Sequence, residues 1–442
     1  MKHDNQSTIV CQIELQSLKN LREEELDHTT KGLPFGARIT PAQVRDRGWN
    51  VLKGDLPFPL LVMKESALEH NLREMAVWCA DHGLLLAPHG KTTMCPQIYE
   101  RQIAHGAWAI TVATVSQALV CASFGISRIV IANQISGASN LHSLSELLNS
   151  QREAELYCLI DSVDGVRHLA EGLERYGARR PINVLLEWGR KGWRTGVRSE
   201  EQGIEVWAEA ARHSHLLKLC GIEAFEGLAS SEDSDDEARQ VDEFFIGLRN
   251  LGQRLRADWL PNDQPILSIG GSAFLDRVIR LAPQVSDEFR VVVRSGCYVT
   301  HDHIQYQHKQ AASMARGRDT LRIPEFIPAL ELWAYVQSMP EEKLAFLTFG
   351  KRDCPHDLGL PKPLFAIAEG DGLSRVRDLS RSAVVNLNDQ HAYLALGDGE
   401  KLEVGDLLCF GISHPCTAFD KWRVIPVVND DYEVIDLYRT FF

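Results

Sequence analysis

Two short motifs at opposite ends of the chain contain residue types that could do chemistry together. The first is Ala87-Pro88-His89-Gly90-Lys91-Thr92, in which Lys91 follows a short apolar run. A lysine amine can form a Schiff base with a carbonyl cofactor where burial or a neighbouring cation lowers its pKa. The second motif is His414-Pro415-Cys416, whose imidazole and thiolate are donors of the zinc type. Together they predict an enzyme that holds a carbonyl cofactor on Lys91 and a metal ion over the same substrate.

Each motif has a simpler interpretation when it is taken alone. Lys91 would then be a surface lysine in a loop, and Cys416 a buried cysteine beside an unrelated histidine. A closed structural zinc site usually has four protein ligands, and the motif supplies only two. Two ligands fit an open site, which leaves positions for water or substrate as catalytic zinc requires.

Two turns that contain glycine follow the last two strands of a predicted barrel. They are Ser268-Ile269-Gly270-Gly271-Ser272 and Arg294-Ser295-Gly296-Cys297-Tyr298. Glycine lets backbone N–H groups approach an anion closely, and Ser272 adds a hydroxyl donor. Each turn alone is an ordinary turn, but together with Lys91 they indicate a phosphate site for a phosphorylated aldehyde cofactor. Arg194, after the fifth strand, is either a contact to the cofactor ring or substrate, or an ordinary loop arginine.

The elements that would position these residues alternate, from about residue 84 to about residue 300, between short apolar runs and longer helical patterns. This alternation predicts an α/β fold with a parallel sheet, and eight units predict a closed (β/α)8 barrel of the TIM type. An open doubly wound sheet is the alternative. In a barrel, the loops after the strands meet at one mouth, which would hold Lys91 and both glycine turns. The expected strands are 84–87, 108–113, 128–132, 155–160, 182–187, 218–224, 266–269 and 290–294.

A second, mainly β domain is expected after residue 315, where apolar runs are separated by glycine and aspartate turns. Its expected strands are 384–394, 406–410, 423–428 and 432–438. The run 57–63 is one further strand, which we expect to join this domain before the barrel begins. The sequence therefore predicts an N-terminal segment (1–65) that contributes to the β domain, a cofactor-binding barrel (66–315) and a C-terminal β domain with the metal site (316–442).

The composition is that of an ordinary globular protein, since 44% of the 442 residues are hydrophobic and 24% are charged. A formal net charge of −13 argues against a nucleic-acid or anionic-membrane partner. The ten cysteines are scattered without a C-x-x-C pair, which is typical of reduced thiols. Residues 1–6 lack the apolar core of a signal peptide, and the chain has no apolar run of about twenty residues that could span a bilayer. We expect a soluble cytoplasmic protein.

Taken together, these residues resemble the pyridoxal-phosphate enzymes of the alanine-racemase-like fold, specifically the D-serine dehydratase and D-threonine aldolase family in its bacterial amino-acid deaminase branch. The likeness runs from about residue 57 to the C-terminus and is most specific at 88–92 and 413–417. It implies a barrel with an appended β domain, in a head-to-tail homodimer. It also implies Lys91 as the Schiff-base lysine of pyridoxal 5'-phosphate, and His414 and Cys416 as ligands of a divalent metal, zinc. Further implied cofactor contacts are His89, Arg194, Gly271, Ser272, Gly296, Cys297 and Tyr298.

The chain departs from the pattern of that family at several positions. The relatives have Arg ahead of Pro-His and a His two residues after the lysine, where this chain has Ala87 and Thr93. Where they carry Tyr-x-Gly-His, this chain has Phe225-Glu226-Gly227-Leu228. Any role of that Tyr or those His residues therefore does not carry over to this chain.

The resemblance implies dehydration of a D-β-hydroxy amino acid such as D-serine to a 2-keto acid and ammonia. Lys91 would act as the base at the α-carbon, and the metal as a Lewis acid on the β-hydroxyl. Retro-aldol cleavage of the D-threonine aldolase type is the near alternative, and amino-acid racemisation is a third, although it needs no metal on the hydroxyl. A pyridoxal-phosphate carrier protein of the same fold is the non-enzymatic alternative, but a carrier has no use for the His-x-Cys pair.

Overall fold

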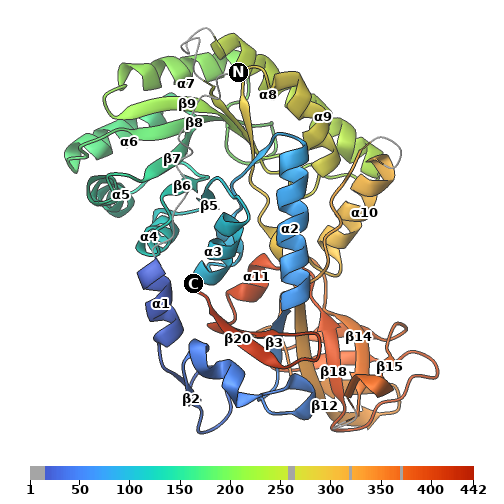
Figure 1. The fold of residues 1–442 in the computed structure, drawn as a ribbon. Helices are drawn as coiled ribbons and strands as arrows, with labels where there is room; N and C mark the ends of the chain where they lie inside the picture. The colour runs from blue at the N-terminus through green and yellow to red at the C-terminus, as the bar shows by residue number, and fades with distance from the viewer. Residues whose placement is uncertain (1–14, 257–263, 318–320, 369–371) are drawn as a thin grey trace, which may run out of the picture.

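The computed structural model describes residues 15–256, 264–317, 321–368 and 372–442. Figure 1 shows two parts, a barrel with its surrounding helices and a sheet domain at the other end of the molecule. Residues 1–6, where the sequence predicts no signal peptide, and Cys11 lie outside the described residues. The nine described cysteines form no disulfide with one another. Within the described ranges, no helix is both long and apolar enough to cross a membrane.

Eight parallel strands form the barrel, in the order β4-β11-β10-β9-β8-β7-β6-β5. Their residues are almost all buried, because both faces of the sheet are covered by side chains. The strands are β4 (Leu85–Leu86), β5 (Ile110–Val112), β6 (Arg128–Ile131), β7 (Glu155–Ile160), β8 (Ile182–Trp188), β9 (Leu217–Ala224), β10 (Ile266–Ile269) and β11 (Arg290–Val293). Each begins and ends within two residues of a strand that the sequence predicts.

The barrel closes between β4 and β5, next to the lysine motif. These two strands share no continuous ladder, but His89 and Thr111 form a parallel bridge between them. The Thr111 N–H also donates to the Pro88 carbonyl over 2.8 Å. Pro88 has no N–H of its own, so regular pairing cannot continue through it. The closed arrangement confirms the predicted (β/α)8 barrel with a second β domain and excludes the open doubly wound sheet.

Helices follow the barrel strands and lie around them (Figure 1). Three of these helices begin in the same way: the hydroxyl oxygens of Thr114, Ser162 and Ser199 each accept a hydrogen bond from a backbone N–H three residues later, at 3.2 Å. Such a cap satisfies a donor that the helix leaves unpaired. The helices are α2 (Glu65–Asp81), α3 (Pro96–Ala104), α4 (Val115–Ser123), α5 (Ala138–Ser150), α6 (Val163–Arg175), α7 (Glu200–Arg212), α8 (Ser234–Leu255), α9 (Leu275–Val285) and α10 (Gln305–Gly317).

The second part is a mainly antiparallel sheet. Strand β3 (Leu60–Lys64) precedes the barrel in the chain but pairs with β12 and β19 of this sheet, so an N-terminal segment contributes to the β domain as the sequence predicts. The other strands are β12 (Leu330–Glu341), β13 (Leu344–Leu347), β14 (Lys362–Ile367), β15 (Arg377–Asp378), β16 (Ala383–Leu387), β17 (Ala392–Ala395), β18 (Leu407–Gly411), β19 (Val424–Val428) and β20 (Val434–Arg439). Domain limits at 65/66 and 315/316 stay predictions.

Two expectations about individual strands are wrong. Residues 384–394 are not one strand but the hairpin of β16 and β17, because turn-forming residues follow β16 and the Asn388 N–H donates to the His391 carbonyl over 2.8 Å. Strand β3 begins only at residue 60, because Pro57 and Pro59 have no N–H for a ladder. Strands β12, β13 and β14 lie where the sequence patterns predict none.

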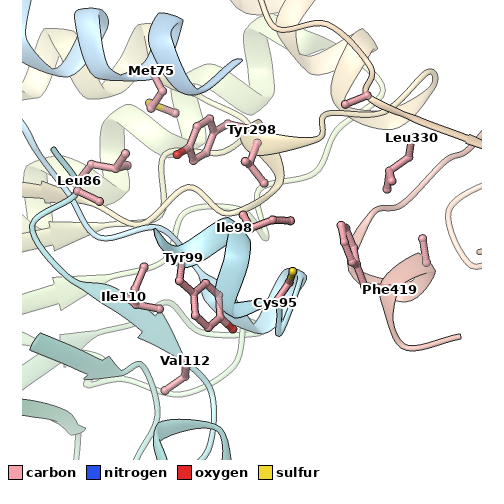
Figure 2. Close-up of a cluster of buried hydrophobic side chains, with 14 of the residues drawn as sticks. Met75, Leu86, Cys95, Ile98, Tyr99, Ile110, Val112, Tyr298, Leu330 and Phe419 are labelled. Atoms are coloured by element: carbon pink, nitrogen blue, oxygen red, sulfur yellow. The ribbon is translucent and has the colours of Figure 1, made fainter. Parts of the chain in front are cut away.

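One buried hydrophobic cluster joins the barrel to the second domain. Figure 2 shows Ile98 and Tyr99 of α3 and Tyr298 of the barrel together with Leu330 and Phe419 of the second domain. All five are buried. Because the two parts share a core, packing fixes how the barrel mouth lies against the second domain.

Candidate active site

Lys91 lies just beyond β4, in the short helical turn η3 (Gly90–Thr92). The Tyr99 hydroxyl donates to the Gly90 carbonyl over 2.8 Å and so holds this turn against α3. Burial lowers the pKa of Lys91, and the charge of Arg194 adds to this effect, although Cys416 and Cys297 act in the opposite direction. A partly desolvated lysine of lowered pKa is a competent nucleophile toward a carbonyl group.

His89 stands beside Lys91 at the barrel mouth. Burial lowers the pKa of His89 well below its usual value, and the nearby charges of Lys91, Arg294 and Arg194 lower it further. The imidazole is therefore neutral near pH 7. Its Nδ1 atom is buried and has no hydrogen-bond partner within the described part of the chain.

A buried ion pair lies behind the mouth. Arg294, at the end of β11, donates to the Glu223 carboxylate and, over 2.8 Å, to the Ala224 carbonyl. Burial raises the pKa of Glu223 to about 8 although Arg294 opposes the shift. The Nε atom of Arg294 and the Oε2 atom of Glu223 are buried without a partner among the described residues. Unpartnered polar atoms of this kind, together with His89 Nδ1, fit a site that receives a polar ring such as that of pyridoxal phosphate.

Arg194 is held over an aromatic ring. Its guanidinium carbon lies 4.2 Å from the centre of the Phe225 ring, a cation–π arrangement. Phe225 follows β9, at the position where the related pattern has Tyr. Arg194 therefore lies at the mouth, near His89 and Lys91.

The glycine turn after β10 is fixed by a carboxylate that the sequence analysis did not select. Glu226, which is buried, accepts hydrogen bonds from the backbone N–H groups of Gly270 and Gly271 at 3.0 and 2.6 Å. The Gly271 amide is thus already paired. Ser272 donates its hydroxyl to Ser295 of the other turn over 3.3 Å, so the two turns lie side by side.

Gly296 leaves no room for a side chain. A Cβ atom there would lie 2.7 Å from the His89 carbonyl oxygen and 2.8 Å from the Thr92 hydroxyl, so the second glycine turn packs directly on the lysine turn. The next residue, Cys297, is buried. The Tyr298 side chain packs in the core, with its hydroxyl near Gln102 at 3.3 Å, so only its backbone can face an anion at this turn.

His414 is oriented by an acidic neighbour. Its Nδ1 lies 2.6 Å from the Asp357 carboxylate, which also accepts from the Thr417 hydroxyl at 2.9 Å. Burial lowers the pKa of His414, but Cys416 and Asp357 outweigh this effect and raise it to about 9. With Nδ1 bound to Asp357, Nε2 is the nitrogen available to a metal, an arrangement common to metal-binding histidines.

Cys416 begins the short helix α11 (Cys416–Phe419), which packs on the lysine turn. Its Sγ lies 3.2 Å from the Thr92 hydroxyl and 3.5 Å from the Sγ of Cys297. Hydrogen bonds with Cys297, His414 and Thr92 lower the pKa of Cys416 well below its usual value, against the effect of burial. A thiolate beside an imidazole fits a divalent metal such as zinc. Among the described residues no group of three or more His, Cys, Asp or Glu is placed to hold a metal ion, so the chain offers two ligands here.

The structure thus gathers most of the predicted site residues at the barrel mouth. His89, Lys91, Arg194 and the two glycine turns meet there, and the second domain brings Cys416 and His414 to the same place. Tyr298 is the exception, because its side chain points into the core. Sequence patterns did not indicate Asp357, Glu223 or Glu226, since an isolated carboxylate carries no motif.

Two family descriptions match the chain. "Alanine racemase, N-terminal domain" matches residues 63–296, which include the whole barrel, and "Putative serine dehydratase domain" matches residues 329–428. The second match includes His414 and Cys416. Both agree with the family that the sequence motifs resemble.

Several characterised proteins are similar to parts of the chain. It is 31% identical over 183 residues to a D-threonine aldolase of Arthrobacter sp, a match that covers 41% of this chain and 47% of that protein. It is 25% identical over 249 residues to D-threo-3-hydroxyaspartate dehydratase of Delftia sp. (strain HT23), covering 56% of this chain and 62% of that protein. The chain spans between 44% and 62% of the length of the curated relatives that it matches.

Solved structures share the fold over nearly the whole chain. The crystal structure of D-threonine aldolase from Filomicrobium marinum has a TM-score of 0.70 at 23% identity and covers 87% of this chain and 95% of that one. The structure of the Delftia dehydratase has a TM-score of 0.66 at 20% identity and covers 89% and 99%. At these identities the likeness shows the fold alone.

Proposed function

The chain belongs to the alanine racemase N-terminal domain family, and we propose that it is a dehydratase dependent on pyridoxal phosphate and a divalent metal. The proposed substrate is a D-β-hydroxy amino acid such as D-serine, and the products are a 2-keto acid and ammonia. The putative serine dehydratase domain over residues 329–428 supports this reaction class.

One contact carries the proposal. The Thr92 hydroxyl lies 3.2 Å from the Cys416 thiol, across the boundary between the barrel and the second domain. Thr92 is adjacent to Lys91, and Cys416 is two residues from His414. The amine that would attach the cofactor and the donors that would hold the metal therefore face one small site, as a reaction at neighbouring α- and β-carbons requires.

The related dehydratase supports the metal assignment. Solved forms of D-threo-3-hydroxyaspartate dehydratase include a histidine-to-alanine variant and a cysteine-to-alanine variant in the metal-free form, and the substituted positions are two residues apart. His414 and Cys416 have the same spacing. We take zinc as the metal because imidazole and thiolate suit it.

Bound pyridoxal phosphate would withdraw electrons from the substrate α-carbon, and the metal would polarise the β-oxygen. Lys91 takes the proton from the α-carbon, because burial lowers its pKa and leaves the amine competent as a base. His414 and Cys416 would hold the metal, and Asp357 fixes the His414 ring through Nδ1 and leaves Nε2 for the metal. Ser272 and the backbone of the Gly296 turn hold the phosphate.

Retro-aldol cleavage is the second candidate, favoured by the 31% identity to D-threonine aldolase over 183 residues. That reaction removes the proton of the β-hydroxyl and breaks the Cα–Cβ bond, giving glycine and an aldehyde. The same residues would serve it, since Lys91 lies at the α-carbon and the metal ligands lie at the β-oxygen. The two candidates differ in which bond at the β-carbon breaks, so the products decide between them.

The test is an assay of purified protein with D-serine, D-threonine and 3-hydroxy-D-aspartate, in which keto acid and aldehyde are measured separately. Keto acid with equimolar ammonia supports the dehydratase. Aldehyde with glycine supports the aldolase and refutes dehydration. Release of neither product from any substrate, by protein with verified cofactor and zinc, would refute both.

A second experiment uses a chelator to test the role of the metal. Removal of zinc, verified by elemental analysis, should abolish keto-acid release and leave the absorbance of the lysine-bound cofactor unchanged. Unchanged turnover would refute the Lewis-acid role. We also propose a cytoplasmic homodimer, with no nucleic-acid or membrane partner, in line with the free thiols and the net charge of −13.

A further inference from the structure

Cys297 lies in the phosphate turn, but its side chain contacts Cys416, a residue of the second domain. Its side chain is 4% exposed, and its Sγ lies 3.5 Å from the Sγ of Cys416. We propose, building on the function above, that Cys297 is a positioning residue whose thiol donates a hydrogen bond to the sulfur of the metal-binding Cys416 and thereby couples metal binding to cofactor binding.

The direction of this hydrogen bond follows from the chemistry of the ligand. Cysteine binds a metal as the thiolate, which has no proton to give. The proton in the contact between the two sulfurs must then belong to Cys297. The Thr92 hydroxyl, 3.2 Å away, would be a second donor to the same sulfur once Cys416 is a thiolate. Donors of this kind fix the orientation of a ligating atom and tune its charge.

The route of coupling runs through the backbone of the phosphate turn. Cys297 directly follows Gly296, which packs so closely on the lysine turn that a Cβ atom there would lie 2.7 Å from the His89 carbonyl oxygen and 2.8 Å from the Thr92 hydroxyl. An anion that orders this turn therefore orders both donors to Cys416, one in the turn itself and one packed against it. Coupling between binding sites is reciprocal, so the metal must in turn favour the cofactor.

The role differs from that of a third ligand. The contact of the two sulfurs at 3.5 Å is the basis on which Cys297 is assigned to the sulfur of Cys416 and not to the metal. Serine at position 297 keeps a donor but cannot supply a thiolate, whereas alanine removes the donor. These two substitutions therefore separate the two roles.

The experiment measures Zn²⁺ affinity by competition with a chromophoric chelator, on protein with and without pyridoxal phosphate. Wild type should bind Zn²⁺ about fivefold or more tightly with the cofactor present. C297A should bind Zn²⁺ about tenfold more weakly than wild type and lose the dependence on cofactor. C297S should recover most of the Zn²⁺ affinity and most of its dependence on the cofactor. C158A, which removes a buried thiol from β7, should behave as wild type.

Replacement of zinc by Co²⁺ gives a readout that loss of folding would not imitate. The charge-transfer absorbance from thiolate to Co²⁺ should have the intensity of one bound thiolate. Its intensity per bound Co²⁺ should be equal in wild type and C297S. A signal of two thiolates that falls to one in C297S would make Cys297 a ligand and overturn the proposal. Zn²⁺ affinity that is unchanged in C297A, with and without cofactor, would also overturn it. Wild-type protein that binds no Zn²⁺ would instead refute the proposed function, and this inference with it.

Discussion

Replacing Glu226 with glutamine should loosen the glycine turn after β10 and weaken cofactor binding. The Glu226 carboxylate is 1% exposed and accepts from the N–H groups of Gly270 and Gly271 at 3.0 and 2.6 Å. Both partners are donors, so two acceptor oxygens are required. Glutamine supplies one oxygen and presents an NH2 group to the other N–H, which leaves one buried amide unpaired.

The size of the effect follows from that lost bond. A hydrogen bond to a charged group contributes about 1.5–3 kcal/mol, so E226Q should lose about 2 kcal/mol of unfolding free energy. The turn also carries Ser272, which stands opposite Ser295 of the second turn. Disorder in the turn should raise the dissociation constant of pyridoxal phosphate by roughly tenfold, which corresponds to about 1.4 kcal/mol.

Two measurements check this prediction. Urea unfolding gives the stability change, and titration with pyridoxal phosphate, followed by visible absorbance, gives the affinity. E205Q is the matched control, because Glu205 is an exposed residue of α7 and its substitution removes the same charge. If E226Q and E205Q show the same unfolding free energy and the same affinity, the carboxylate does not hold the turn and the reasoning is refuted.

Three further predictions concern the other parts of the site. Lys91→Ala should bind no cofactor covalently and release no keto acid, and retention of the visible absorbance would contradict its role. Asp357→Asn should weaken Zn²⁺ binding by about 10–100-fold in a competition titration, because the His414 ring loses its charged partner; wild-type affinity would show that the carboxylate is dispensable. Arg294→Met should cost about 1–3 kcal/mol in urea unfolding, because it leaves the buried Glu223 carboxyl without its hydrogen-bond donor, and an unchanged unfolding free energy would contradict the buried pair.

The barrel was predictable because its strands are local features of the sequence. Each is a short apolar run that ends where a helical pattern begins, and the runs 155–160 and 266–269 coincide with β7 and β10. Lys91 could be placed at the mouth for the same reason, since its position after the first strand determines it. The second sheet was less predictable: the sequence placed β3 in it, but β12, with which β3 pairs, lies where the sequence patterns predict no strand.

The partners of the site residues could not be predicted, because they are remote in the chain. Asp357 is 57 positions from His414, and Thr92 is 324 positions from Cys416. The contact of Thr92 with Cys416 forms because α11 packs on the lysine turn. The contact of Asp357 with His414 joins two separate loops of the second domain. Glu226 lies in the segment 225–228, which was noted only because it departs from the family pattern. Its hydrogen bonds with Gly270 and Gly271 depend on how β9 and β10 lie side by side.

The closure of the barrel has a consequence for local unfolding. Strand β4 has two residues and pairs with β11 over two positions. On the side of β5 it has no regular ladder: the Leu86 carbonyl accepts from the Trp108 and Ala109 N–H groups at 2.6 and 3.4 Å, and His89 and Thr111 form an isolated bridge. The strand that precedes Lys91 is thus short, and its Leu86 side chain packs in the cluster of Figure 2. Tyr99 belongs to that cluster and also holds the Gly90 carbonyl. The free energy of opening at the lysine turn is accordingly set by the core shared between the two domains, so a cavity made at Phe419 lowers it.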